Sequence, residues 1–151
     1  AMTINYGKRL FIPKIEPAAF VDQRLVVFDP KGDVDIELCH ALLNSAISLF
    51  IIEGMGFGRG LGALDLNKDR IEDFMHLLDP NKLTVDAINK IKREFSVLKE
   101  RDVMEIADEL EQEDRKKFDD AIIEGYKLTV DRLEIYDCLL ALVEIRMAAV
   151  Q

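Results

Sequence analysis

The sequence predicts an α+β fold that is mostly α, in which a small N-terminal β-element packs on a buried central helix and a helical C-terminal bundle follows. Two short runs rich in β-branched and aromatic residues lie within residues 8–28, an apolar stretch covers residues 38–52, and helical periodicity extends from residue 83 onward. A chain of 151 residues buries about 68–70% of the surface that it exposes when unfolded. We expect one compact unit: a β-containing portion over residues 1–66 and an acidic helical portion over residues 67–151.

The predicted strands are Lys8–Ile15 and Arg24–Phe28. Pro13 removes a hydrogen-bond donor from the first strand, which should therefore lie at an edge or bend at this residue. A turn is expected over residues 29–32 from their composition, with proline near one end and glycine at the other.

The central helix is expected to begin at the N-cap Asp33 and to run to about Glu53. Apolar residues surround almost its whole circumference, which is typical of a helix in the middle of a domain. The narrow polar seam of this helix consists of Glu37, His40, Asn44 and Ser48. His40, like His76, has no evident catalytic partner in the sequence, so a structural role is expected for both.

A glycine-rich segment, residues 54–62, follows the central helix and has five glycines at alternate positions. Such a segment forms neither a stable helix nor a good strand. After it, Ala63–Leu66 is expected to be a brief strand, and a short helix should start at Asn67 or Asp69 and run through Phe74.

Two identical Leu-Thr-Val-Asp tetrapeptides, residues 83–86 and 128–131, predict two helix starts with Thr84 and Thr129 as N-caps. Between them, the apolar stripes 103–110 and 118–122 are separated by a charged stretch, so either two helices meet there or one long helix has an exposed middle. The pair Asp119 and Asp120 is expected on a solvated face. The last helix has an apolar seam that must dock on another surface. Its residues are Leu133, Tyr136, Leu140, Val143, Met147 and Val150.

Charge and cysteine content narrow the class of protein. The net charge is −9, which excludes a generic polyanion-coating protein, but residues 1–32 have five basic side chains against three acidic ones. Cys39 and Cys138 lie among apolar neighbours, which predicts buried free thiols and a reducing, cytoplasmic location.

The apolar run 38–52 is too short and too polar to span a bilayer, so no membrane partner is expected. Ala1 before Met2 is typical of a cleaved tag, and we expect a piece of a longer protein.

No catalytic constellation is evident in the sequence. It lacks a metal-ligand cluster, a Walker-type phosphate loop and a nucleophile elbow, so no catalytic residue, cofactor site or metal site is assigned. Gly58–Ala63 formally fits a dinucleotide-binding pattern, but it follows a helix where that pattern should follow a strand. Two interpretations of the glycine-rich segment stay open. The glycines end the helix and allow a sharp turn, or their backbone N–H groups and Arg59 lie against nucleic-acid phosphates.

Four segments resemble one family. Ala41–Ser45 followed by Gly58–Leu66 resembles a region of the adenine-specific DNA methyltransferases of restriction–modification systems that lies in their target recognition region, downstream of the catalytic domain. Lys8–Ile15 is similar to the strand that precedes this region, and Asp119–Thr129 with Tyr136 and Arg146 is similar to the C-terminal tail of several members. The resemblance touches residues 8–147 in order, and its middle block is the most specific.

The resemblance implies a function for the parent protein. Such enzymes transfer a methyl group from S-adenosylmethionine to the N6 atom of an adenine flipped out of the duplex, using an Asn/Asp-Pro-Pro-Tyr/Phe motif. This chain has no Pro-Pro, because Asp79-Pro80 is followed by Asn81, and it has no doubly wound cofactor domain. The resemblance therefore implies the non-catalytic C-terminal part, with S-adenosylmethionine bound by the missing catalytic domain. Its partners would be double-stranded DNA and that catalytic domain.

The expected DNA contacts centre on Arg59 with Gly58, Gly60 and Gly62, and the weaker backbone contacts are Lys8, Arg9, Lys14 and Lys68. Asn44 and Ser45 match the family's Asn-Ser, but they lie in a largely buried helix and are expected to be structural polar residues that hold a neighbouring segment. The family often has glycine where Ala63 stands and more basic residues around the loop, so we expect weak, salt-dependent binding by the isolated chain, about 10⁻⁴ to 10⁻⁶ M.

An alternative of a different class stays open. The chain would be a helical protein-interaction or dimerisation module without DNA contact, with a homodimer formed through Leu133, Leu140, Val143 and Met147. A free-standing small enzyme has no positive support in the sequence.

Overall fold

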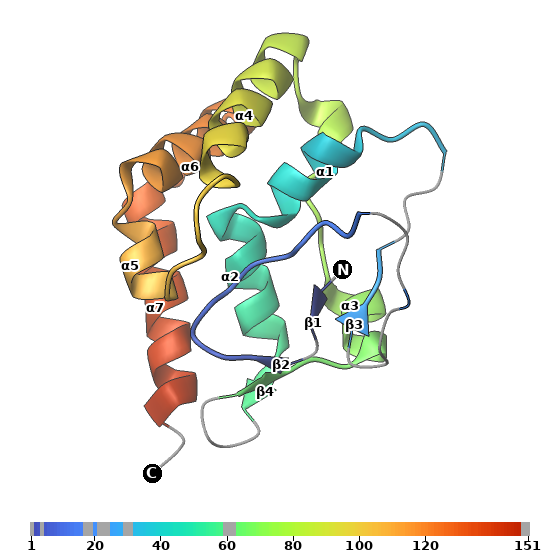
Figure 1. Ribbon diagram of the computed structural model, residues 1–151. Coiled ribbons are helices and arrows are strands. Elements are labelled where there is room, and N and C mark those ends of the chain that lie inside the picture. The colour runs from blue at the N-terminus through green and yellow to red at the C-terminus, as the bar shows by residue number, and fades with distance from the viewer. Residues whose placement is uncertain are drawn as a thin grey trace.

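The computed structural model describes residues 2–3, 5–16, 20, 25–28, 32–58 and 63–148, and it is mostly helical with a small β part (Figure 1). The predicted fold class is thus confirmed. The helices are α1 (Ile36–Leu43), α2 (Ala46–Met55), α3 (Lys68–Phe74), α4 (Val85–Leu98), α5 (Ile106–Leu110), α6 (Glu113–Tyr126) and α7 (Arg132–Ala148), with a short 3₁₀ turn, η1, at Pro80–Lys82. The strands are β1 (Met2–Thr3), β2 (Asn5–Tyr6), β3 (Leu25–Val26), β4 (Phe57–Gly58) and β5 (Leu64–Asp65).

The strands form two small antiparallel sheets. One pairs β1 with β3, and the other has the order β2-β5-β4. Leu64 is paired with Tyr6 on one side and with Gly58 on the other. Because β2 and β4 are both antiparallel to β5, they run in the same direction.

The prediction of a strand over Lys8–Ile15 is wrong. Residues 7–16, the extended segment, cross α2 without joining either sheet (Figure 1). Leu10 and Ile12 are buried while their neighbours are more exposed, so the alternation typical of a strand is present. The backbone hydrogen bonds of Ile12 go to the side chain of Asn44, the residue after α1, instead of a neighbouring strand. Of the second predicted strand, only Leu25–Val26 forms a strand among the residues described.

The central helix is two helices with a 61° bend between them, which corrects the expectation of one helix to Glu53. Asn44 is the C-cap of α1, and the hydroxyl of Ser45 accepts a hydrogen bond from the N–H of Ser48 as the N-cap of α2. Asn and Ser side chains compete with the helical backbone for hydrogen bonds, which explains the break. The N-cap of α1 is Asp35 and not Asp33.

Local capping signals in the second half are mostly confirmed. Asn67 caps α3 and Thr84 caps α4, as predicted. The prediction for Thr129 is wrong, because the side chain of Asp131 accepts from Glu134 N at 2.9 Å and takes that role for α7. The charged stretch between the apolar stripes separates two helices, α5 and α6.

Two apolar clusters fill the interior. The first lies mainly between α2 and α7, and the second lies between α1, α4 and α6. Both clusters contain residues from either side of position 66. The seam of α7 largely docks inside the chain: Tyr136 and Val143 are buried, Leu140 and Met147 pack against the first cluster, and Leu133 is exposed.

Two further expectations concern the apolar run and the cysteines. Among the residues described, no single helix is long and apolar enough to cross a membrane. Only α1 and α2 together reach that length and hydropathy, across their bend. Both cysteines are free thiols, but Cys138 is exposed and Cys39 is half-buried, so the prediction that both are buried is wrong. Cys138 lies on the exposed side of α7, whereas its apolar sequence neighbours Tyr136 and Leu139 face the interior.

Candidate nucleic-acid interface

The glycine-rich segment leaves the structure's main sheet at the end of β4. Gly58 is the last residue of β4, while Arg59, Gly60 and Gly62 lie outside the described residues. A β-carbon on Gly56, which joins α2 to β4, would overlap the side chain of Leu64. At this position glycine is required because the chain passes directly over β5.

The register of the sheet brings Lys8 and Arg9 to the end at which this segment leaves. Tyr6 and Gly58 are both paired with Leu64, and β2 and β4 run in the same direction. The chain following Tyr6 and the chain following Gly58 therefore leave the same end of the sheet, two strand spacings or roughly 10 Å apart. Lys8 and Arg9 come two and three residues after Tyr6, and Arg59 comes directly after Gly58.

The backbone of residues 7 and 8 is anchored from the C-terminal helices. The N–H of Ile106, at the start of α5, donates to the Lys8 carbonyl oxygen at 2.8 Å. Nη2 of Arg146, on α7, donates to the Gly7 carbonyl oxygen at 3.0 Å. The side chain of Lys8 is half exposed and forms an ion pair with Glu105 at 3.5 Å, whereas the exposed Arg9 takes part in none of the ion pairs between described residues. Exposed pairs of this kind contribute little stability, so Lys8 can exchange Glu105 for a phosphate at small cost.

Lys14 and Lys68 lie elsewhere. Lys68 begins α3, beyond the opposite end of β5, and pairs with Glu72 at 3.3 Å. Lys14 lies at the far end of the extended segment and pairs with Glu16 at 2.5 Å. The hydrogen bond that the Lys14 ammonium donates to the Glu16 carboxylate stabilises both charged forms, so it raises the pKa of Lys14 and lowers the pKa of Glu16. The structure thus divides the predicted contact residues into one group beside the loop and two separate lysines.

Asn44 binds the extended segment with its amide. Its Oδ1 accepts from Ile12 N at 2.8 Å, and its Nδ2 donates to Ile12 O at 2.9 Å and to His40 O at 2.9 Å. The ring Nε2 of His40 donates to the same Ile12 oxygen at 2.8 Å. Ser45 instead caps α2 and donates to Leu42 O at 2.8 Å. These two residues therefore have structural contacts, and Asn44 takes the place of a neighbouring strand.

Asp119 is a buried junction between three elements, which corrects the expectation of a solvated pair. It is 3% exposed, and it accepts hydrogen bonds from Ala46 N at the start of α2, from Arg115 Nε and from the Tyr136 hydroxyl, each at 2.8 Å. Burial and the Asp119 carboxylate raise the pKa of Tyr136, which therefore stays a donor at neutral pH. Asp120, the next residue, is exposed and pairs with Arg132. The helical periodicity set by the apolar residues Phe118 and Ile122 indicates that Asp119, and not Asp120, faces inward.

A second buried polar pair was not identified from the sequence. Glu53 and Arg146 are 5% and 6% exposed, and their atoms Oε1 and Nε are 2.6 Å apart. Glu53 is the single charged residue of α2, and Arg146 is the single basic residue in the second half of α7. The lone acid of the apolar helix α2 is the signal in the sequence that such a residue needs a basic partner.

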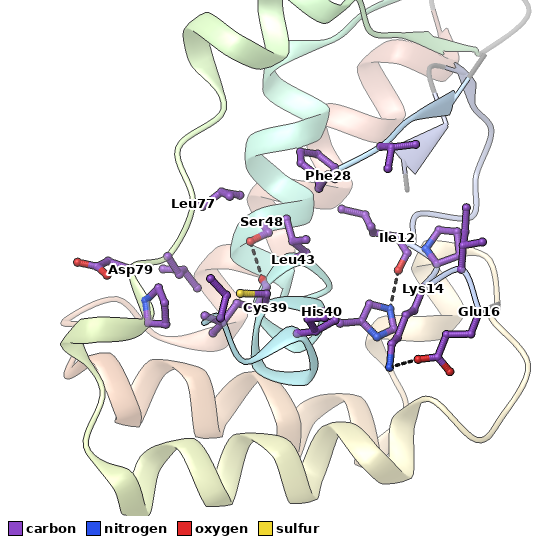
Figure 2. Close-up of a pocket in the computed structure, with 18 residues that line it drawn as sticks. Ile12, Lys14, Glu16, Phe28, Cys39, His40, Leu43, Ser48, Leu77 and Asp79 are labelled. Carbon is purple, nitrogen blue, oxygen red and sulfur yellow. Dashed lines mark hydrogen bonds and ion pairs between the residues drawn. The ribbon is translucent and has the colours of Figure 1, made fainter. Parts of the chain in front are cut away.

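An apolar cavity of about 630 Å³ lies between the end of the extended segment, α1 and residues 77–80 (Figure 2). Figure 2 shows Lys14, Glu16 and His40 on one side of it and Leu77 and Asp79 on the other. Two polar side chains that line the cavity already have hydrogen-bond partners: His40 Nε2 donates to Ile12 O, and the hydroxyl of Ser48 donates to Leu42 O. Burial raises the pKa of the Cys39 thiol, which therefore stays protonated at neutral pH. The cavity can take an apolar group, but it has no nucleophile paired with a base.

In the part of the chain that the structure describes, no group of three or more His, Cys, Asp or Glu residues is placed to hold a metal ion. Comparisons with protein-family models, with curated proteins and with solved structures find no match to this chain. Among the described residues, the candidate interface is the end of the β2-β5-β4 sheet from which Lys8 and Arg9 follow Tyr6.

Proposed function

We propose that this chain is the non-catalytic C-terminal part of an S-adenosylmethionine-dependent, adenine-specific DNA methyltransferase of a restriction–modification system, and that it contributes to target recognition in the cytoplasm. The observation that carries the proposal is the position of Lys8 and Arg9 at the sheet end from which the glycine-rich loop departs. S-adenosylmethionine and the methyl transfer belong to the catalytic domain of the parent enzyme.

The segments that carry the family resemblance are connected by buried polar contacts, which supports a common origin of their sequence pattern. Asn44 connects residues 41–45 to Ile12. Asp119 connects the C-terminal block to Ala46, directly after Ser45. Arg146 connects the last helix to Glu53 and Gly7. These buried contacts hold the fold together, and in this proposal the glycine-rich loop, residues 59–62 of which lie outside the described residues, is the part that binds the ligand.

In this proposal the loop and the two cations work together on the DNA backbone. Glycines allow close approach of backbone N–H groups to phosphates, and arginine supplies a bidentate donor. Contacts of this kind position a protein on DNA, while base contacts specify the sequence. Helices α5 and α6 each have two more acidic than basic side chains and are repelled by DNA, while the N–H of Ile106 at the start of α5 holds the backbone of Lys8.

The test is a fluorescence-anisotropy titration of a labelled mixed-sequence duplex at about 50 and 200 mM salt. We expect weak binding that falls with salt and falls several-fold further in Arg59→Ala. The matched control is Arg93→Ala, which removes the same charge from an exposed position on α4 and should bind as the unmodified chain does. Absence of binding at low salt, or equal affinities for Arg59→Ala and Arg93→Ala, would contradict the proposal.

The alternative, a protein-interaction or dimerisation module, is favoured by the apolar surface that the fold leaves open. Leu133 is 62% exposed at the start of α7, although Val143 of the same predicted interface is buried. A second copy of the chain is the partner in this case. Light scattering that detects a dimer, dissociated by Leu133→Glu, together with no DNA binding would favour the alternative over the methyltransferase proposal.

A further inference from the structure

We infer that Arg146 is a positioning residue for the cationic sheet end: its guanidinium fixes the point from which Lys8 and Arg9 extend relative to the chain that enters β4. The inference rests on the proposed function, since it assigns a purpose to a buried ion pair that lies outside the candidate DNA contacts.

The contacts of Arg146 connect the two chain segments that flank the interface. Its Nε and Nη2 bind Oε1 and Oε2 of Glu53 at 2.6 and 3.3 Å, and Nη2 also binds the Gly7 oxygen at 3.0 Å. Glu53 lies four residues before Phe57, where β4 begins, and Gly7 directly follows β2. One planar group therefore relates the chain entering β4 to the chain leaving β2.

The sheet alone does not fix this relation. Each of its strands has two residues, and such short strands are only marginally stable without further contacts. The position of residues 7–9 depends instead on Arg146 and on the bond from Ile106 N to Lys8 O. An exposed cation contributes to a phosphate site only when its backbone is held, because otherwise binding must also order the chain.

The chemistry of the pair also indicates a geometric role. Burying two charges is costly, and apolar side chains of similar volume often stabilise a core as well or better. A guanidinium has rigid donors in several directions and can hold a carboxylate and a carbonyl oxygen at once, which a lysine ammonium on a flexible stem does poorly. Arg146→Lys keeps the charge beside Glu53, so the chain should still fold while the hold on Gly7 is lost.

The first measurement is the rate of trypsin cleavage after Lys8 and Arg9, followed by mass spectrometry. Arg146→Lys should raise this rate about threefold to tenfold, because local opening of the segment becomes easier. The matched control is Arg132→Lys, the same exchange on the same helix at a residue paired with Asp120, and it should leave the rate unchanged. Circular dichroism at the same temperature checks that both variants are folded. Equal cleavage rates for the two variants would overturn the inference without touching the proposed function.

The second measurement is a double-mutant cycle on DNA affinity. Arg146→Lys should weaken binding about threefold to tenfold in the unmodified chain but less than about twofold when Lys8→Ala and Arg9→Ala are already present. A general loss of structure would weaken binding equally in both backgrounds, and that result would overturn the inference. If neither the unmodified chain nor its variants bind DNA, the proposed function fails and the inference falls with it, whatever the cleavage rates are.

Discussion

At the scale of single residues, one buried amide replaces a whole strand. Asn44 is 7% exposed and satisfies both the N–H and the carbonyl oxygen of Ile12. Pro13 has no N–H, so the extended segment cannot form a regular ladder beyond Ile12. The Asn44 amide supplies one donor and one acceptor at the spacing of a strand backbone, and it therefore takes the place of the missing ladder.

Replacing Asn44 with alanine should lower the free energy of unfolding by about 1–3 kcal/mol, because it leaves the buried N–H of Ile12 without a partner, while the Ile12 oxygen keeps only the donor from His40. Urea denaturation at neutral pH measures the change. Asn81→Ala removes an exposed amide that bonds only to Asp79, and it should change the stability by less than about 0.5 kcal/mol. Similar values for the two variants would show that the Asn44 contacts contribute little.

His40 makes the stability of the chain depend on pH. Burial lowers the pKa of His40 below its ordinary value of 6.5, against the opposing effect of its bond to Ile12 O, and Lys14 and Lys99 lower it further. The unfolded chain then binds more protons than the folded chain as the pH falls. The stabilising contribution is present above the unfolded pKa of 6.5 and is lost as the pH falls through it toward the lower folded value.

The urea midpoint should accordingly decrease between pH 7.5 and 5.5, and His40→Gln should reduce that decrease. Asp35 and Asp114, whose pKa values are lowered from 3.8, affect stability only in a more acidic range. His76→Gln changes an exposed histidine and is the control. If both histidine variants keep the full decrease, His40 is not its source.

At the scale of elements, α2 begins where three other elements meet. Its first N–H, on Ala46, is bound by Asp119 of α6, which also binds Tyr136 of α7. The break at Asn44–Ser45 lets α1 pack on α4 while α2 packs on α7. One straight helix could not reach both clusters, so the bend and the aspartate that stabilises it determine the architecture.

The neighbouring aspartates of α6 give a matched pair of variants. Asp119→Ala leaves the buried Arg115 charge without its carboxylate and should destabilise the fold by about 3–5 kcal/mol. Asp120→Ala removes an exposed partner of Arg132 and should cost less than about 1 kcal/mol. Thermal unfolding followed by circular dichroism compares them, and equal destabilisation would mean that Asp119 is not the junction described.

At the scale of the whole molecule, charge is distributed unevenly over the fold. Residues 67–151 have 14 basic and 21 acidic side chains, whereas residues 1–66 have 6 and 8. The helical part therefore has the larger excess of acidic side chains and is repelled more strongly by DNA than residues 1–66 are.

Lys8→Ala combined with Arg9→Ala should reduce the slope of log K against log salt by about 1.8, the value for two lost phosphate contacts. The control, Lys14→Ala with Lys68→Ala, removes the same formal charge from positions away from the loop and should leave the slope within about 0.5 of its original value. DNA titrations at four or more salt concentrations give both slopes. Equal slopes for the two double variants would argue against a localised interface.

The sequence predicted the helices whose starts depend on neighbouring residues. Asn67 and Thr84 cap the helices that follow them, and Leu64–Asp65 forms the brief strand expected after the glycine-rich segment. Of the candidate site, the sequence singled out the loop and the basic residues. It could not separate Lys8 and Arg9 from Lys14 and Lys68, because strand register decides which of them lie together.

By itself, then, the sequence determined the mostly-α class and the starts of α3 and α4, because caps and periodicity act over three or four residues. Only the tertiary structure decided the bend at Asn44–Ser45, the burial of Asp119 and the contact of Arg146 with Gly7. These features depend on hydrogen bonds between residues 32, 73 and 139 positions apart, respectively. A polar side chain is stable inside a protein only where a partner meets it, and local sequence can indicate that a polar residue faces inward but not which distant residue it meets.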